Sequence, residues 1–304
     1  MRIIVVFIVL LSLVLIEAFL EVIYKNTDNY KISNQQRIRL MNVPNDLEVV
    51  NIGSGPVYYG IDYTYCDRNG YNLATAPQNF EYGYKILRRF SSNLKPGATV
   101  IITVMAPMSF GQNEDILRKD YADRYYGILS PEEIDNYSIK RAFVVNHPLL
   151  FALINEIRQL FRNPNQTGKK LSIVEVWKGE FGLKNLRDGE QGRDHSVTFL
   201  SKVNLLVEMV KYCRDNQWNP VFVIPPIPET TRLEISEEFL NAFVWDNMSI
   251  VKEKVGEIKI LNYYDDPRFG MDLFYNDIFL NDKGTEIFSK ILFEEIYSQE
   301  NGDI

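Results

Sequence analysis

The chain has 304 residues, of which 46% are apolar and 24% charged, and its formal net charge is −7. This length accommodates one large α/β domain or two small ones. The acidic balance argues against a nucleic-acid binder, which needs a clustered basic face, and the sequence holds no Lys/Arg run longer than a pair. We therefore expect no nucleic acid among its partners.

Cysteine and histidine are both scarce, which limits the chemistry available. Cys66 and Cys213 allow one bridge at most, and Cys213 lies in a helical pattern where we expect it to be packed. The absence of a Cys-x-x-Cys excludes a cysteine-built zinc site. His147 precedes a proline and is interpreted as a turn residue, which leaves His195 as the other imidazole. We expect neither a metal site nor a cofactor.

The N-terminal segment MRIIVVFIVLLSLVLIEAFLEVIYK is strongly apolar. Residues 3–16 form an uncharged run of 14, and apolar character continues to about Ile23 past Glu17 and Glu21. The whole run can cross a bilayer as a helix, and the clean part also fits a signal-peptide core. We see no convincing A-x-A cleavage site, and Arg2 favours an N-terminus that stays inside. We expect an anchor at residues 1–24 with the remainder extracytoplasmic; a cleaved signal, giving a secreted protein, and a buried helix are the alternatives.

After a polar stretch at residues 25–46, interpreted as a stalk, strand-like and helix-like segments alternate through one domain at residues 47–304. Strand patterns occur at 47–53, 70–76, 97–107, 219–227 and 258–264. Helix patterns occur at 78–94, 147–162, 197–217, 236–256 and 281–299, with Ser236 as an expected cap. Five apolar strands joined by helices predict a parallel sheet covered on both faces, whose strand-to-helix turns meet at one edge. The stretch 163–196 is predicted to be a long surface insertion.

Several segments resemble one known superfamily, in its order along the chain. They are NIGSGPVYYGIDY, GYNLATAPQNFEYGYKIL, LKPGATVIITVMAPMSF, RYYGILSPEEIDNYSIK, NPVFVIPPI and LFYNDIFLNDKGTEIFSKIL. They are similar to SGNH/GDSL hydrolases, and more closely to membrane-anchored SGNH-like proteins of bacterial cell-envelope polysaccharide modification. The resemblance implies a three-layer, flavodoxin-like α/β fold. It also implies a cell-surface polysaccharide or its acyl group as ligand, O-acetylation as the reaction, and a membrane O-acyltransferase as partner.

The chain departs from this family where the chemistry should be. The family uses a serine in a Gly-x-Ser turn after the first strand, and an Asp-x-x-His before the last helix that activates it. Here the nucleophile position is Gly55, with Ser54 one residue early. The aspartate position is Asn276 and the histidine position is Phe279. A glycine cannot attack a carbonyl and a phenylalanine cannot accept a proton, so the resemblance predicts a degenerate site.

Other residues are candidates for the missing roles. Ser54 with a relocated base at His195 would restore a nucleophilic pair, although His195 also fits a plain helix-start loop. Tyr58 and Tyr59 are candidates for a sugar-binding platform, but aromatics at helical spacing also form core. Asp277 is a candidate cleft residue or a solvated loop acid. We therefore interpret the chain as a degenerate SGNH-like protein that binds a glycan or partner. An active carbohydrate esterase or O-acyltransferase, and a structural subunit of an envelope assembly complex, are the alternatives.

Overall fold

The computed structural model describes residues 2–105, 108–110, 121–160, 171–181, 183–189 and 196–298. Their contacts divide the chain into two compact units. We call Met1–Asn42 with Arg118–Lys169 the helical unit, and Val43–Leu117 with Lys170–Ile304 the α/β unit. This division differs from the single domain expected from residue 47 onward, because residues 118–169 group with the N-terminal segment instead of with the sheet.

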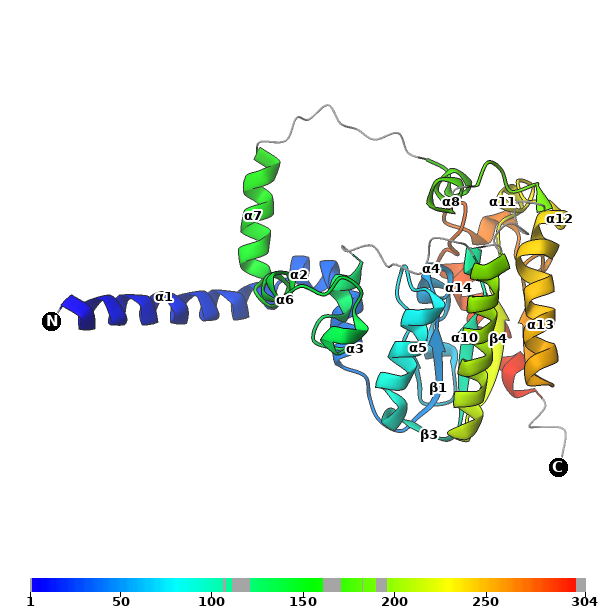
Figure 1. The fold of residues 1–304 in the computed structure, drawn as a ribbon, viewed down its shortest axis with the longest axis horizontal. Helices are drawn as coiled ribbons and strands as arrows, with labels where there is room; N and C mark the ends of the chain where they lie inside the picture. The colour runs from blue at the N-terminus through cyan, green and yellow to red at the C-terminus, as the bar shows by residue number, and fades with distance from the viewer. Residues whose placement is uncertain are drawn as a thin grey trace. The chain divides into compact units, whose positions relative to one another are not determined.

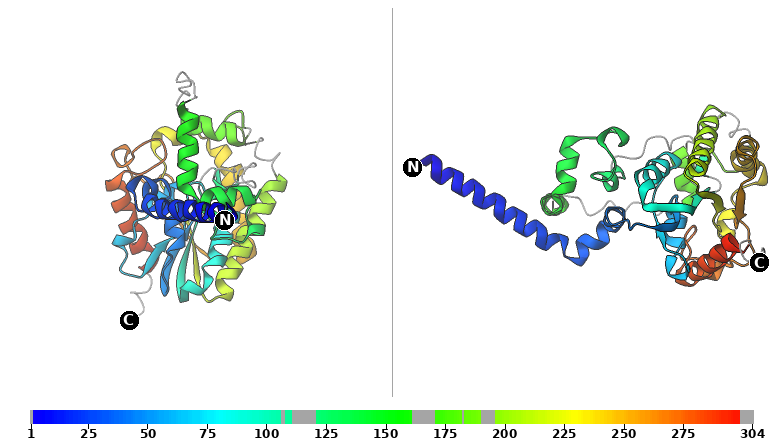
Figure 2. Two further views of the ribbon diagram at one scale, coloured as in Figure 1. Left: turned by 90° about the vertical axis from the view of Figure 1, so that its left-hand side faces the viewer. Right: turned by 90° about the horizontal axis from the view of Figure 1, so that it is seen from below.

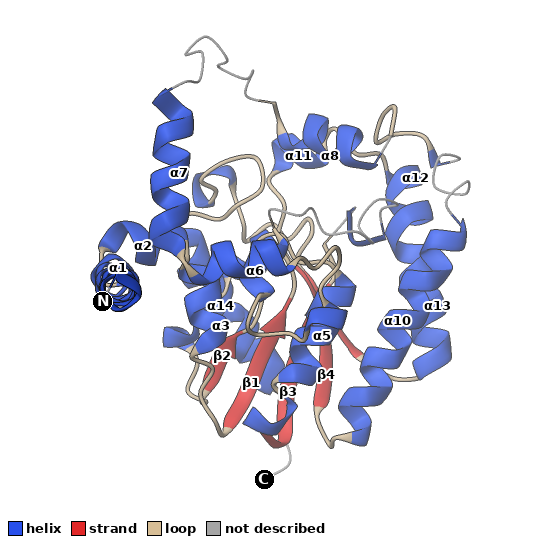
Figure 3. Cartoon of the chain, turned by 60° about the vertical axis from the view of Figure 1, so that its left-hand side comes forward, coloured by secondary structure: helices blue, strands red, loops and turns tan. Residues whose placement is uncertain are grey.

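The α/β unit is built on one parallel sheet of five strands in the order β2-β1-β3-β4-β5 (Figure 3). The strands are β1 Leu47–Ile52, β2 Gly70–Asn72, β3 Leu94–Thr103, β4 Asn219–Ile224 and β5 Lys259–Asn262. This is the order of a flavodoxin-like doubly wound fold, so the predicted fold class is confirmed. The centre of β3 is fully buried from Val100 to Ile102, as a strand covered on both faces must be.

Two strands end earlier than their apolar patterns predict. The second stops at Asn72 instead of residue 76, because the Asn72 side chain accepts a hydrogen bond from the Ala74 N–H at 3.1 Å and forms a turn. The third ends at Thr103 instead of residue 107. Both shifts lengthen the loops at the carboxyl edge of the sheet, where the candidate site lies.

Helices cover both faces of this sheet (Figure 1). The helices of this unit are α4 Gly55–Gly60, α5 Phe80–Arg89, α8 Ile173–Phe181, α10 Ser196–Asp215, α11 Glu229–Arg232, α12 Glu237–Leu240, α13 Asp246–Val255 and α14 Asp282–Tyr297. Phe288 and Leu292 of α14 pack in one core with Val49 of β1 and Val223 of β4, while α5 and α10 contact β1 and β4. The predicted helix at 236–256 contains a π-helical turn, Asn241–Trp245. Its predicted cap is confirmed, since Ser236 accepts from the Phe239 N–H at 3.1 Å.

The helical unit contains α1 Arg2–Lys25, α2 Asp28–Ser33, α3 Gln35–Met41, α6 Ile139–Asn146 and α7 Pro148–Leu160. Within the described residues, the segment Ile3–Lys25 of α1 is the one helix long and apolar enough to cross a membrane, with a mean hydropathy of 3.2. In the left view of Figure 2 the blue helix α1 runs sideways and the green helix α7 runs upward, and Figure 3 shows α1 end-on with α7 from the side, so the two helices run crosswise.

The stretch expected to be a stalk is helical and packed. Tyr30, Arg37 and Leu40 of α2 and α3 are buried. The Arg37 guanidinium donates to the Tyr126 carbonyl at 3.2 Å, and to the Val145 carbonyl and the Asn146 side chain at 3.4 and 3.2 Å. The polar composition of residues 25–46 indicated a stalk, but the polar side chain of Arg37 makes specific hydrogen bonds. These bonds hold α3 against later residues of the helical unit.

Candidate functional site

The site predicted from the sequence begins at the turn after β1. Gly53 has a φ of 144° and a Cβ there would lie 2.6 Å from the Thr103 Cβ, so both its conformation and its space require glycine. Ser54 follows and is half-buried at the N-terminus of α4. Its Oγ accepts a hydrogen bond from the Gln78 N–H at 3.4 Å. The hydroxyl is therefore held against the turn that follows β2.

Gln78 closes this turn, and sequence reasoning did not identify it. Its side chain is buried, its Oε1 accepts from the Gly53 N–H at 2.7 Å, and its Nε2 donates to the Leu73 carbonyl at 3.2 Å. Gln78 thus satisfies backbone groups from the turns after both β1 and β2. No local pattern marks it, because Gly53 lies 25 residues earlier in the chain.

The Phe279 ring lies on Gly55. A Cβ built on Gly55 would be 2.7 Å from the Phe279 Cε1 and 3.0 Å from its Cζ. Asn276 shapes the turn that carries this ring, since its Oδ1 accepts from the Ile278 and Phe279 N–H groups at 3.0 and 2.8 Å. The two positions matched to the nucleophile and the histidine of the resembled family are therefore in contact. An aromatic ring occupies the space that a side chain on residue 55 would need.

The pairing of Ser54 with His195 as a relocated base remains a prediction. His195 lies outside the described residues, and among those described no hydrogen bond joins the Ser54 hydroxyl to an imidazole or a carboxylate. His147, the other histidine, belongs to the helical unit, where its Nδ1 lies 2.7 Å from the Glu17 Oε1. It is more than the turn residue that the sequence indicated, because it pairs with the N-terminal helix.

Asp277 has structural partners on both sides. Its Oδ2 accepts from the Ile173 N–H, the first residue of α8, at 2.7 Å. Its carbonyl accepts from the Thr231 hydroxyl at 2.6 Å. The carboxylate stabilises a helix N-terminus, where negative charge is favourable. Asp277 therefore joins α8 and α11 to the loop that carries Phe279.

The two tyrosines proposed as a sugar-binding platform, Tyr58 and Tyr59, differ in their exposure. Tyr58 is buried in the core beside Phe288, so it is not available as a ligand-binding surface, which corrects that expectation. Tyr59 is 46% exposed and its ring meets that of Phe279 edge to face, with centroids 5.1 Å apart. The exposed aromatic surface at this edge is therefore Tyr59 with the half-buried Phe279.

Asp266, Arg268, Glu295 and Cys213 of the α/β unit have structural roles. Hydrogen bonds from Arg268 hold the pKa of Asp266 below its usual range, and Arg268 also reaches the Glu295 carboxylate at 2.9 Å. Burial raises the pKa of the Cys213 thiol to about 12, so this cysteine is packed, as predicted. Both cysteines are free thiols. Among the described residues, none of these groups contacts Ser54 or Phe279.

Three side chains of the helical unit are of metal-ligating types. One ligand atom each from Glu17, Glu21 and His147 lies within 4.8 Å of the others. Glu17 contacts His147, the Glu21 Oε1 accepts from the Leu149 N–H at 2.8 Å, and its Oε2 lies 3.7 Å from the Lys25 ammonium. These contacts explain why the three side chains lie together, because they dock the start of α7 on α1.

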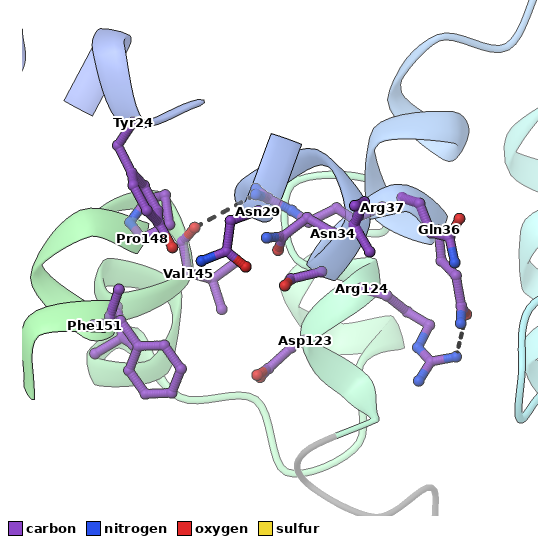
Figure 4. A pocket seen from close by; sticks show the side chains of 15 residues that line it. Tyr24, Asn29, Asn34, Gln36, Arg37, Asp123, Arg124, Val145, Pro148 and Phe151 are labelled. Carbon is purple, nitrogen blue, oxygen red and sulfur yellow. Dashed lines mark hydrogen bonds between the residues drawn. The ribbon is translucent and has the colours of Figure 1, made fainter. Parts of the chain in front are cut away.

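A polar pocket of about 460 Å³ also lies in the helical unit (Figure 4). Arg37 and Arg124 line it with Asn29, and Phe151 with Tyr24 adds aromatic surface. Both guanidinium groups have protein partners, since Arg37 holds the chain as described and Arg124 donates to the Gln36 Oε1 at 2.5 Å. The pocket offers polar contacts but no nucleophile paired with a base.

Comparison with known proteins adds little to this geometry. No family model matches the chain, and no curated protein matches it. Among solved structures, it is similar to a protein from Bacteroides fragilis described as a "putative acylhydrolase". That similarity has a TM-score of 0.40 at 10% sequence identity and covers 91% of this chain and 98% of the other. A likeness of this size establishes neither a family nor a reaction.

Proposed function

We propose that this chain is a membrane-anchored, extracytoplasmic SGNH-like protein that binds a cell-surface glycan or a partner of polysaccharide modification, without acyl-transfer chemistry of its own. The observation that carries the proposal is the Phe279 ring on Gly55. A catalytic serine at residue 55 would need the space that the ring fills, and a base at residue 279 would need a nitrogen that phenylalanine lacks. The flavodoxin-like strand order supports the scaffold half of the proposal.

Binding instead of catalysis also suits the surface of the site. Tyr59 is exposed and touches Phe279, so two aromatic rings lie at the sheet edge where ligands of such folds bind. Aromatic rings present an apolar body that packs against the C–H faces of a sugar, while a tyrosine hydroxyl supplies a polar contact. The proposed ligand is therefore a glycan that stacks on Tyr59.

The apolar helix α1 supports the anchoring half of the proposal. It is long and apolar enough to cross a membrane, and all the side chains of its apolar window are unburied. We propose that it stays attached as a single crossing, with Arg2 on the cytoplasmic side. A membrane O-acyltransferase acting on the same polysaccharide is the proposed neighbour.

The rival function is an esterase or acyltransferase that uses Ser54. The position of the half-buried Ser54 at the sheet edge favours it, and a base from the loop that contains His195 would be required. The full-length protein in detergent should show no labelling by a fluorophosphonate and no turnover of p-nitrophenyl acetate. Labelling that Ser54→Ala abolishes would contradict the binding proposal and establish this rival.

Glycan binding separates the proposal from a structural subunit. We expect the full-length protein to bind a subset of an array of bacterial surface glycans, and Tyr59→Ala to weaken that binding at least tenfold. Tyr65→Ala is the matched control, because Tyr65 is another exposed tyrosine of the same unit. No binding to any glycan, or equal loss in both variants, would favour a structural role in an assembly complex.

A further inference from the structure

The helical unit carries an apolar surface that nothing in the described chain covers. We call it the outer face. Its members are large apolar side chains of α6 and α7, each at least about one-third exposed: Ile139, Phe143, Leu150, Leu153, Ile154 and Ile157. The four on α7 follow the i, i+3, i+4, i+7 spacing of a single helical stripe. A stripe of exposed apolar side chains such as that of α7 marks contact with a partner or a membrane.

The opposite side of α7 is occupied. Pro148, Phe151 and Ala152 line the polar pocket together with residues of α2 and α3. At about 100° per residue, these positions lie roughly opposite the stripe that includes Leu153 and Ile157. Because α2 and α3 follow the C-terminal end of α1, the outer face is turned back toward the N-terminal part of α1. This is the direction in which a bilayer crossed by α1 would lie.

Three polar contacts fix the corner between α6 and α7 along one face of α1. The Glu17 Oε1 lies 2.7 Å from the His147 Nδ1, and the Glu21 Oε1 accepts from the Leu149 N–H at 2.8 Å. One turn further on, the Lys25 ammonium donates to the Asn146 carbonyl at 3.3 Å. Since α7 runs crosswise to α1, a helix α1 that crosses a bilayer holds α7 along the bilayer plane (Figure 1).

Helix length places this corner at the depth of the lipid. The uncharged run Ile3–Ile16 is about 21 Å long at 1.5 Å per residue, whereas the hydrocarbon core is about 30 Å thick. A crossing helix must therefore bring Glu17 and Glu21 to the edge of the hydrocarbon. Carboxylates are costly there unless paired. The α6–α7 corner supplies those pairs, so it lies at the same depth.

We propose that α6 and α7 form an interfacial element, which lies in the headgroup layer of the bilayer with the outer face against the acyl chains. The inference rests on the proposed anchoring by α1. Apolar faces of amphipathic helices bind membranes in this orientation, and a second contact strengthens an anchor whose uncharged run is shorter than the hydrocarbon core. The pocket on the other side of α7 then faces the water-filled side of the interface.

Site-specific lipid quenching tests the orientation in the full-length protein. Single cysteines at Ile8, Leu153, Ile157 and Leu233 are labelled with an environment-sensitive NBD dye in a Cys66→Ser background, because Cys213 is buried. The protein is reconstituted in phosphatidylcholine and phosphatidylglycerol vesicles with or without doxyl-labelled lipid. We expect at least twofold quenching for I8C, L153C and I157C. Leu233 is an exposed apolar residue of the α/β unit and its label should stay unquenched.

The outcomes separate the inference from the anchoring proposal. Quenching of I8C alone would overturn the interfacial element and leave the anchor intact. An unquenched I8C would overturn the anchoring and the inference together. Blue-shifted but unquenched labels at 153 and 157 would show that protein, such as a second copy, covers the outer face, which also overturns the inference. Quenching at 153 and 157 that the double variant Leu150→Glu, Ile154→Glu reduces would support it further.

Discussion

The two units treat the same class of side chain in opposite ways. In the α/β unit, Val100 and Ile102 of β3 are completely buried between two helical layers. In the helical unit, Leu153 and Ile157 of α7 are 53% and 56% exposed, and α1 is exposed along its whole apolar window. A soluble core hides such residues, and the exposed apolar side chains of the helical unit are what the proposed contact with lipid requires. The exposure of apolar side chains, more than their number, distinguishes the helical unit from the α/β unit.

The units are alike in one respect, since each depends on a buried polar side chain. Gln78 joins two turns of the α/β unit, and Arg37 joins α3 to later residues of the helical unit. Buried polar groups must be hydrogen-bonded, so removal of either leaves orphaned partners. The three tryptophans, Trp177, Trp218 and Trp245, all lie in the α/β unit, so their fluorescence reports that unit alone.

The largest expected effect is that of Gln78→Ala. It leaves the Gly53 N–H and the Leu73 carbonyl without partners, and each such buried group costs about 1–3 kcal/mol. We expect the free energy of unfolding of the α/β unit to fall by roughly 2–4 kcal/mol, measured by urea denaturation followed by tryptophan fluorescence. Glu81→Ala is the control, because it removes only a surface pair with Lys85. Equal losses in the two variants would contradict a specific role for Gln78.

Arg37→Met should destabilise the other unit. The apolar stem is kept, but two carbonyls and the Asn146 side chain lose a charged donor, and hydrogen bonds to charged groups contribute about 1.5–3 kcal/mol. We expect faster amide hydrogen exchange at residues 28–41 and 139–146 and an unchanged tryptophan-detected transition. A parallel shift of that transition would mean that the two units unfold as one cooperative block, which would contradict their independence.

The contact between Gly55 and Phe279 predicts that the effect of Gly55→Ala on the free energy of unfolding depends on residue 279. In the native background, Gly55→Ala places a methyl 2.7 Å from the Phe279 ring and should destabilise by about 1–2 kcal/mol. In a Phe279→Ala background the same change should be neutral or stabilising, because alanine is the better helix former. Urea denaturation of the four variants of this cycle measures the coupling. The same penalty in both backgrounds would show that the ring does not fill the space beside residue 55.

The smallest effect is the acid response of the Asp266–Arg268 pair. Because the folded-state pKa of Asp266 is lowered, the pair contributes stability above the unfolded pKa of about 3.9, and this contribution is lost as pH falls through the folded pKa. Unfolding free energies measured between about pH 5 and pH 3 should therefore fall less steeply in Asp266→Asn than in the native chain. Arg268→Gln should flatten the curve equally, since it removes the cause of the shift. A native slope in either variant would contradict this role.

Sequence reasoning predicted the site unevenly. The residue types alone show that Gly55 offers no nucleophile, Asn276 no carboxylate and Phe279 no base. Their mutual contact is not, because it depends on a turn shaped by the Asn276 side chain far along the chain. Tyr58 and Tyr59 are adjacent tyrosines with the same local pattern, and only packing against α14 buries the first and leaves the second exposed.

The α/β class, the five strands, the Ser236 cap and the apolar N-terminal helix could be predicted from the residues, because each depends on local periodicity or on neighbours three residues away. The grouping of residues 118–169 with residues 1–42, and the closure of the turn after β1 by Gln78, became visible only in the folded chain. Those choices depend on hydrogen bonds such as Arg37 to Tyr126 and Leu149 to Glu21, which join segments 89 and 128 residues apart. Partners at such separations leave no periodic trace in the chain, since the fold alone brings them together.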